Sequence, residues 1–375
     1  MNNSKYIIII ALLLSLGLSS CQQKYEPGYG LKEVPEGRID IPEIEALLTF
    51  MGNSGDYINS PTFPSLIKAE DVYEDLNRYF VIDIRNNEDY RAGHINGAVN
   101  IDIPNLMDYL NKTVAASAYE RLVIVCKNGQ TSAYVTGVLR LLGYSNAYSM
   151  SYGMSSWNPS IDHWSDRISN KYASKLETKE NTLVKTYPFP PIKTDQSCGA
   201  EILNARGITL FNTPTNRLMI KADRVFDELD EFHIVAYMPK EIYDQGHIPG
   251  AFHYEPKQSF SKEGLLNTLP SNNKKILVYD YTGQTASSVM SYLRLLGYNA
   301  FTMPMGANSF MYDIIKTNGK PVFEKSKKVS NFPLIKGNTP TDKAFEKQIN
   351  SSVPTPKKVK RVIRRKKKEV EGGCS

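Results

Sequence analysis

The sequence is poor in cysteine, with 4 in 375 residues. Three of them, Cys126, Cys198 and Cys374, lie beyond the N-terminal segment 1–21, which holds the fourth, Cys21. Because an odd number of thiols cannot all pair within one chain, the sequence excludes a complete disulfide framework. We therefore expect at least one thiol to take part in a reaction.

The N-terminal apolar stretch is too short to cross a membrane. It covers residues 6–18, whereas a spanning helix needs about 20 residues, so it matches the core of a signal peptide. It ends in Leu-Ser-Ser-Cys, which resembles a bacterial lipobox. The resemblance implies that residues 1–20 are a lipoprotein signal peptide and that Cys21 carries a lipid; an ordinary signal peptide with a chance cysteine is the alternative. The chain is thus predicted to be anchored on the periplasmic side of a bacterial cell envelope, and Gln22 favours the outer membrane.

The body of the chain lacks a strong charge of either sign. The net charge of +6 comes from residues 357–375, which carry nine Lys and Arg and two Glu. Without that tail and the signal peptide, 35 basic and 37 acidic residues remain, so the sequence predicts no nucleic-acid partner. The basic segment 357–368 could bind acidic lipid headgroups or polysaccharide, keep a tether extended, or dock on a protein partner through its apolar residues.

The chain contains the same pattern twice. Residues 93–98 read GHINGA and residues 246–251 read GHIPGA, while LRLLGY occurs at 139–144 and again at 293–298. The offset between the copies is 153 or 154 residues. A period this long indicates duplicated domains and not a solenoid of short units.

Within each copy, short apolar strands alternate with amphipathic helices. In the first copy we expect strands at 79–84 and 122–125, and helices at 69–77, 103–112 and 132–142. This alternation predicts an α/β class with two domains, each a mostly parallel sheet flanked by helices. The predicted order is a signal peptide (1–20), a first domain (40–165), a linker strap (166–195), a second domain (196–325), and a strap with a flexible basic tail that ends in Gly-Gly-Cys (326–375).

Cys126 directly follows the predicted strand at 122–125 and precedes the predicted helix at 132–142. Ligands of parallel α/β sheets usually bind at the carboxyl ends of the strands, which is where this thiol lies. Loop amides and a helix N-terminus favour an anion, so they favour the nucleophilic thiolate. Gly129 permits the tight curve that such a loop needs.

The residues around this loop resemble the rhodanese family. The matching residues of the first copy are VIDIR at 81–85, EDY at 88–90, GHI at 93–95, Gly97, Ala98, the Cys126 loop, Gly153 and Trp157. The resemblance implies a sulfurtransferase or persulfide carrier, in which Cys126 takes a sulfane sulfur from thiosulfate, a polysulfide or a persulfide and passes it to a thiol acceptor. It implies no metal and no cofactor.

The resemblance also assigns the site. The expected persulfide-binding loop is Lys127, Asn128, Gly129, Gln130 and Thr131. In principle its five amides can face the sulfur, and we expect Lys127 to contact the donor anion. Members with high thiosulfate activity often carry Arg where Thr131 stands here, which argues against thiosulfate as the preferred donor. Asp83 and Arg85 are expected to form a structural ion pair that supports the loop; direct contact with the substrate is the alternative.

The second copy departs from the family pattern at its catalytic position. Asp280 replaces Cys126, and Ala236 and Met238 replace Asp83 and Arg85. Because a carboxylate cannot carry a persulfide, the second domain is predicted to be inactive. Most tandem members keep the active cysteine in the C-terminal copy, so the order is inverted here. His94 and His247 recur in both copies, which favours structural hydrogen bonds over catalysis.

Two other functions fit parts of the pattern. The chain could be a non-catalytic binding module that recruits a partner at the membrane surface. A cysteine-dependent phosphatase would need an Arg six positions after Cys126, where Ser132 stands. Cys374 behind two glycines resembles the swinging arm of sulfur-carrier proteins, so we hypothesise that it accepts sulfur from Cys126; an exposed thiol without that role is the alternative.

Overall fold

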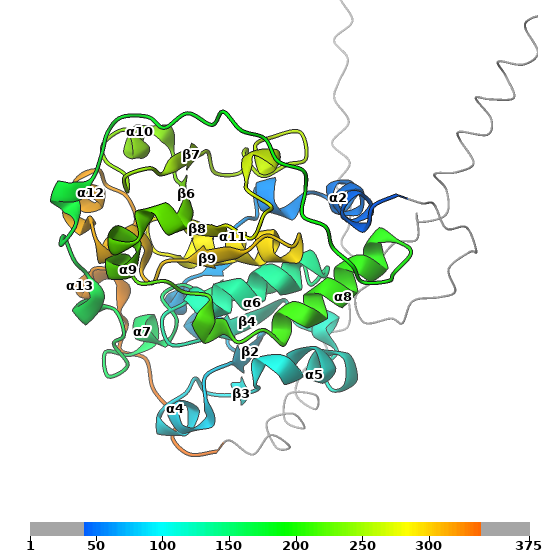
Figure 1. Ribbon diagram of the computed structural model, residues 1–375. Coiled ribbons are helices and arrows are strands. Elements are labelled where there is room, and N and C mark those ends of the chain that lie inside the picture. Colours follow the sequence, from blue (N-terminus) through cyan, green and yellow to red (C-terminus); the bar gives the residue numbers. More distant parts are fainter. Residues whose placement is uncertain (1–40, 339–375) are drawn as a thin grey trace, which may run out of the picture. The chain divides into compact units, whose positions relative to one another are not determined.

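The computed structural model describes residues 41–338, which form two parallel sheets (Figure 1). The first sheet has the strand order β1-β5-β4-β2-β3 and the second has the order β7-β6-β8-β9. The strands of the first sheet are β1 (Leu66–Ile67), β2 (Tyr79–Asp83), β3 (Val99–Asn100), β4 (Arg121–Val125) and β5 (Ala147–Met150). Those of the second are β6 (Phe232–Tyr237), β7 (Phe252–Tyr254), β8 (Lys275–Tyr279) and β9 (Ala300–Thr302).

Helices alternate with the strands in both copies, which confirms the predicted α/β class with two parallel sheets flanked by helices. The helices before and within the first copy are α2 (Glu43–Asn53), α3 (Ala69–Glu74), α4 (Asn87–Ala92), α5 (Leu106–Lys112), α6 (Gln130–Leu141) and α7 (Met154–Trp157). Those of the second copy are α8 (Gly199–Phe211), α9 (Ala222–Asp227), α10 (Lys240–Tyr243), α11 (Gln284–Leu295), α12 (Tyr312–Thr317) and α13 (Lys325–Lys328).

The predicted elements of the first copy are present with shifted ends. The strands expected at 79–84 and 122–125 are β2 and β4. The helix expected at 132–142 is α6, which starts earlier, at Gln130, because Gly129 adopts a φ of 87° and turns the chain into the helix. The helix expected at 69–77 ends at Glu74, and the one expected at 103–112 begins with a 3-10 turn before α5.

The sheets are buried on both faces, as parallel sheets usually are. All five residues of β2 are buried. One face of the first sheet, which includes Phe80 and Ile124, belongs to a hydrophobic cluster that also contains Val278 of the second sheet. The two domains therefore share one continuous core, and helices α6 and α11 lie between the sheets (Figure 1).

Equivalent helices of the two copies pack against each other, α6 on α11 and α2 on α8. The first pair approaches closely at Gly137, where an added Cβ would lie 2.2 Å from Ser291 Oγ. The second pair approaches closely at Gly199, where an added Cβ would lie 2.4 Å from Phe50 Cβ. The sequence thus places small residues where the backbones of the two copies meet.

The segment that follows the first domain lies on the second domain. The Tyr172 ring stacks on Phe226 of α9, with ring centroids 4.1 Å apart. Glu177 pairs with His247 in an isolated antiparallel bridge. Part of the predicted linker strap is therefore bound to the second copy.

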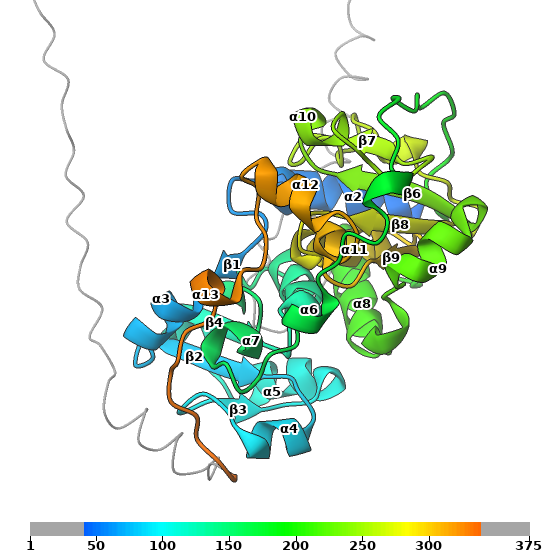
Figure 2. The same cartoon turned by 90° about the vertical axis from the view of Figure 1, so that its left-hand side faces the viewer.

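The segment that follows the second domain returns to the first. The Phe332 ring stacks on Tyr73 of α3, with ring centroids 4.1 Å apart, and Ile335 pairs with His94. Trp157 donates from Nε1 to the Pro333 carbonyl at 2.9 Å. Figure 2 shows this segment in orange, running past α3 and α7. Each domain is thus contacted by the segment that follows the other domain, and these contacts hold the two domains together.

The recurring histidines have equivalent roles in the two copies. His94 donates from Nδ1 to the Tyr90 carbonyl at 2.9 Å, and His247 donates from Nδ1 to the Tyr243 carbonyl at 2.7 Å. Both side chains are fully buried and stack on those tyrosine rings. These contacts confirm the structural hydrogen bonds that the repeat predicted.

Within residues 41–338, no helix is both long and apolar enough to cross a bilayer. The predicted signal peptide and Cys21 lie outside the described residues, and so do Cys374 and the basic tail. Their predicted roles stay predictions.

Candidate active site

Cys126 follows β4 at the carboxyl edge of the first sheet, and α6 begins four residues later. The residue is 5 % exposed. Its carbonyl accepts a hydrogen bond of 2.8 Å from the amide of Met154, the first residue of α7. The thiol is thus held in a short loop between a strand and a helix, as the sequence predicted.

The Cys126 sulfur is surrounded by hydrogen-bond donors. The amides of Gly129 and Ser132 donate to Sγ at 3.2 and 3.3 Å. The Ser132 hydroxyl lies 3.2 Å from the same sulfur. Donors aimed at one buried sulfur stabilise its anionic form, because they replace the water that burial removes.

Of the loop amides 127–131 that could face the sulfur, that of Gly129 donates to it. The amide of Gln130 instead donates to Asn128 Oδ1 at 3.2 Å. The left-handed turn at Gly129 directs its own amide at Sγ and starts the helix, so the second amide comes from Ser132, beyond the predicted loop. The Gln130 side chain also leaves the site and reaches the second domain, where it donates to the Met303 carbonyl at 3.0 Å.

A pair of hydroxyls extends the site beneath the sulfur. Ser132 Oγ lies 2.8 Å from Ser149 Oγ on β5, and Ser149 can donate to the Gly129 carbonyl at 3.4 Å. The hydroxyl hydrogens can rotate, so Ser132 can accept from a thiol or donate to a thiolate. Sequence analysis missed both serines. A comparison of the two loops would have found Ser132, because Ala286 replaces it in the copy that has Asp280 in place of Cys126.

Replacing Ser132 with Ala should slow persulfide formation about tenfold or more, because a hydrogen bond to a charged group is lost. The rate of sulfur loading in a single turnover measures this directly. Ser149→Ala is the matched control and should have a smaller effect, since Ser149 acts on the sulfur only through Ser132. Equal loading rates in wild type and Ser132→Ala would contradict the role given to this hydroxyl.

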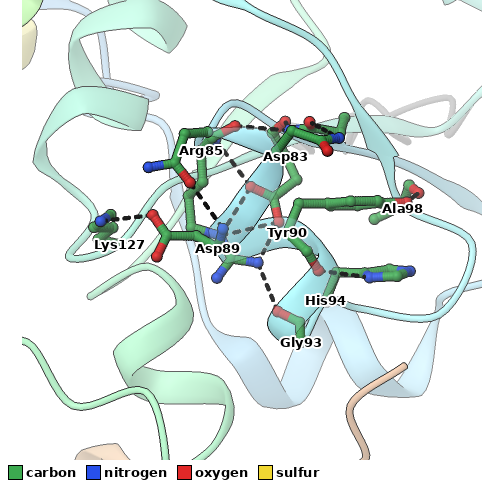
Figure 3. Close-up of polar contacts among 11 residues, drawn as sticks. Asp83, Arg85, Asp89, Tyr90, Gly93, His94, Ala98 and Lys127 are labelled. Carbon is green, nitrogen blue, oxygen red and sulfur yellow. Dashed lines mark hydrogen bonds and ion pairs between the residues drawn. The ribbon is translucent and has the colours of Figure 1, made fainter. Parts of the chain in front are cut away.

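The one basic residue of the predicted loop is already paired. Lys127 Nζ lies 2.6 Å from Asp89 Oδ2 on α4 (Figure 3). Its side chain is 45 % exposed, so the ammonium lies at the surface. Thr131 is half-buried in the first turn of α6. The pairing lowers the positive charge that Lys127 offers to a donor anion, and its role as donor contact stays a prediction.

Asp83 and Arg85 form a buried ion pair beside the loop (Figure 3). Arg85 donates from Nη2 to Asp83 Oδ2 at 2.6 Å and from Nε to Oδ1 at 3.0 Å. The same Nη2 donates to the Gly93 carbonyl at 2.8 Å. Because Asp83 pairs in register with Val125, the ion pair fixes the strand end next to Cys126.

Two further residues of the site were missed by sequence analysis. Trp164 is fully buried and donates from Nε1 to the Asn128 carbonyl at 3.1 Å, which covers the loop. His163 precedes it, and its amide is linked to the Lys127 carbonyl through the Ser155 hydroxyl. Burial, together with the nearby Lys127 and Arg167 cations, lowers the pKa of His163. The imidazole is therefore neutral near pH 7. Neither residue carries a local motif that a sequence would reveal.

The second domain keeps the same loop around a carboxylate. Asp280 Oδ1 accepts from the Ala286 amide at 3.2 Å, and Oδ2 accepts from the Thr282 amide at 3.3 Å. Burial raises the pKa of the Asp280 carboxyl, and these amides oppose the shift. Ala236 and Met238, which replace the ion pair, are fully buried.

The raised pKa of Asp280 predicts a pH-dependent stability. A carboxyl whose pKa is raised by folding contributes stability that is present below its unfolded pKa of about 4 and is lost as the pH rises through the folded value. As the pH rises above about 4, the free energy of unfolding should therefore fall more steeply in wild type than in Asp280→Asn. Urea unfolding across this range checks the prediction, and parallel pH profiles would contradict it.

These features define the class of protein: two duplicated parallel α/β domains, of which the first carries a buried thiol held by amides between a strand and a helix. The rhodanese-like domain family matches residues 68–160 and 222–312. The chain belongs to the rhodanese family and contains two rhodanese-like domains.

Several relatives are similar over one domain's length. The thiosulfate sulfurtransferase GlpE of Pseudomonas fluorescens is 34% identical over 77 residues, which cover 20% of this chain and 68% of that protein. The same enzyme of Shewanella oneidensis is 32% identical over 78 residues, which cover 21% of this chain and 74% of that protein. A rhodanese-like domain protein from Staphylococcus aureus, known from a crystal structure, is 27% identical over 24% of this chain and 87% of that chain, with a TM-score of 0.21. The two thiosulfate sulfurtransferases support membership of a sulfurtransferase family, at modest identity over a single domain.

Proposed function

We propose that this protein is a sulfurtransferase that carries sulfane sulfur as a persulfide on Cys126. The observation that carries the proposal is the set of donors on Sγ: the amides of Gly129 and Ser132 and the Ser132 hydroxyl, all within 3.3 Å. Such a site stabilises a sulfur anion without a metal or a cofactor. The family relationship adds support, since matched relatives are thiosulfate sulfurtransferases.

The reaction takes place in two substitutions. The Cys126 thiolate attacks the outer sulfur of the donor, a bond forms between the two sulfurs, and the donor's S–S bond breaks, with its electron pair leaving on sulfite or on a thiolate. The outer sulfur of the resulting persulfide is then attacked by an acceptor thiolate. The S–S bond on Cys126 breaks, the acceptor leaves as a persulfide, and the Cys126 thiolate is restored.

The charge at the site favours an organic persulfide or a polysulfide over thiosulfate as the donor. The thiosulfate dianion needs cations for its sulfonate group. Here Lys127 is paired with Asp89, the neighbouring His163 has a lowered pKa, and Thr131 offers no charge. Persulfides and polysulfides have no sulfonate group, so they need fewer of these contacts.

Replacing Asp89 with Asn should release Lys127 and raise kcat/KM for thiosulfate. The expected gain is about two- to fivefold, the range of an exposed ion pair. The same variant should leave kcat/KM for glutathione persulfide nearly unchanged, which is the internal control. A variant that shows no gain with thiosulfate would contradict the assignment of Lys127 as the donor contact.

Donor profiling tests the proposed function. Transfer of sulfur to cyanide or to a thiol is measured for thiosulfate, inorganic polysulfide and glutathione persulfide, with wild type and Cys126→Ser side by side. We expect turnover with at least one donor, and we expect it to depend on Cys126. A wild-type protein that transfers no sulfur from any of these donors would favour the binding-module alternative.

The proposal places the transfer at the cell envelope, through lipid attachment at Cys21. Palmitate labelling in a bacterial host, compared with Cys21→Ala, tests the anchor.

We further propose that Cys374 accepts sulfur from Cys126. Mass spectrometry of Cys126→Ser protein should then find Cys374 without added sulfur; undiminished loading of Cys374 would rule out a relay from Cys126.

A further inference from the structure

The first residues of α6 and α11 are equivalent glutamines, and each reaches into the other domain. Gln130 donates from Nε2 to the Met303 carbonyl at 3.0 Å and accepts at Oε1 from the Met305 amide at 2.9 Å. Gln284 accepts at Oε1 from the Tyr152 amide at 2.7 Å. Both side chains are at most 2 % exposed. The two loops are thus joined by a reciprocal pair of buried amides.

Gln284 lies directly against the peptide that binds the sulfur. A Cβ added to Gly129 would be 2.4 Å from Gln284 Oε1. Gly129 is the residue whose amide donates to Cys126 Sγ. The glycine therefore leaves room for the glutamine of the other domain, and that glutamine limits how far the Gly129 peptide can move.

Gln284 also binds the segment that packs against the other side of the Cys126 loop, at Tyr152 and Gly153. The Tyr152 amide donates a hydrogen bond to Gln284. Tyr152 has a φ of 61°, a left-handed conformation that is unfavourable for a residue other than glycine unless its surroundings stabilise it. The next residue, Gly153, packs so closely that an added Cβ would lie 2.4 Å from the Cys126 carbonyl and 2.6 Å from the Gly129 amide nitrogen. One side chain of the second domain thus contacts the loop and anchors the segment behind it.

We infer that Gln284 is a positioning residue for Cys126, and that holding this loop is the role that the inactive domain retains. The inference rests on the proposed sulfur transfer. It assigns to the second domain a contribution to the chemistry of the first that does not require a thiol of its own. Gln284 does not touch the sulfur; it acts through Gly129 and Tyr152.

Three substitutions of Gln284 in the full chain test the inference. Gln284→Ala removes the acceptor, and Gln284→Met fills similar volume without an oxygen, whereas Gln284→Glu keeps an acceptor oxygen for the Tyr152 amide. Sulfur loading is followed in single turnovers with glutathione persulfide as the donor. We expect Gln284→Ala and Gln284→Met to lower the maximal loading rate about tenfold or more, with little change in the half-saturating donor concentration. We expect Gln284→Glu to keep most of the wild-type rate.

The matched control is Ser288→Ala, one turn further along α11. Ser288 donates to the Ala133 carbonyl at 3.1 Å, so its loss weakens the same helix interface away from the loop. It should lower thermal stability without lowering the loading rate. Unchanged loading rates in both Gln284→Ala and Gln284→Met would overturn the inference, and so would an equal loss of rate in Ser288→Ala.

Amide hydrogen exchange separates this inference from the proposed function. Gln284→Ala and Gln284→Met should raise exchange over residues 126–132, whereas Ser288→Ala should not. If wild type loads no sulfur, the proposed function fails, and exchange alone decides the positioning role. Exchange over 126–132 that matches wild type in both Gln284 variants would then overturn it.

Discussion

Replacing Arg85 with Met is expected to destabilise the protein by about 3–5 kcal/mol, the usual result of breaking a buried ion pair from one side. Arg85 is 4% exposed and Asp83 is 1% exposed. Without the guanidinium, the Asp83 carboxylate stays in the core after losing its donors at 2.6 and 3.0 Å. The Gly93 carbonyl loses its donor as well. Urea unfolding of the full chain measures the loss.

The second domain supplies the matched control for this prediction. Ala236 and Met238 occupy the equivalent positions and are fully buried. The double variant Asp83→Ala, Arg85→Met removes both charges together, so it should be considerably more stable than Arg85→Met alone. If the double variant were as unstable as Arg85→Met, the loss of stability would not come from leaving the Asp83 charge buried without its partner.

Replacing Cys126 with Asp is expected to abolish sulfur transfer while the protein still folds. Removing the nucleophile of a covalent mechanism lowers activity by at least about 10³-fold. The fold should survive because the second domain already places Asp280 in an equivalent loop, with amides at 3.2 and 3.3 Å from its oxygens. Steady-state transfer and circular dichroism give the two readouts.

Cys198→Ser is the matched control for the loss of a thiol. Cys198 is also buried, but it stands before α8, at the N-cap of that helix, and it is not part of the Cys126 loop. We expect this variant to transfer sulfur at the wild-type rate. If activity survived in Cys126→Asp and disappeared in Cys198→Ser, the nucleophile would be Cys198 and our assignment of Cys126 would be wrong.

The sequence predicted those features that local patterns determine. The apolar run before Cys126 indicated a buried strand, and β4 is buried along four of its five residues. Gly129 indicated a tight turn, and it has the left-handed conformation that only glycine adopts without strain. The repeat predicted two domains of one fold, since duplicated patterns fold alike.

Contacts between distant residues could not be predicted in this way. Gln130 lies in the loop by sequence, yet its side chain bonds to residues 173 and 175 positions further along. Trp164 lies in a segment without strand or helix periodicity, yet it covers the loop through the Asn128 carbonyl. Such contacts depend on how the two sheets meet, and no local window of the chain contains that information.

The most direct measurement is the location of added sulfur after the full chain reacts with glutathione persulfide. Peptide mass spectrometry, with cyanide treatment as the control that removes sulfane sulfur, distinguishes Cys126 from Cys198 and Cys374. Our account predicts added sulfur on Cys126, and on Cys374 only by way of Cys126, so that cyanide removes it and both sites lack it in Cys126→Ser. A protein whose Cys126 stays unmodified by every donor tested would contradict it.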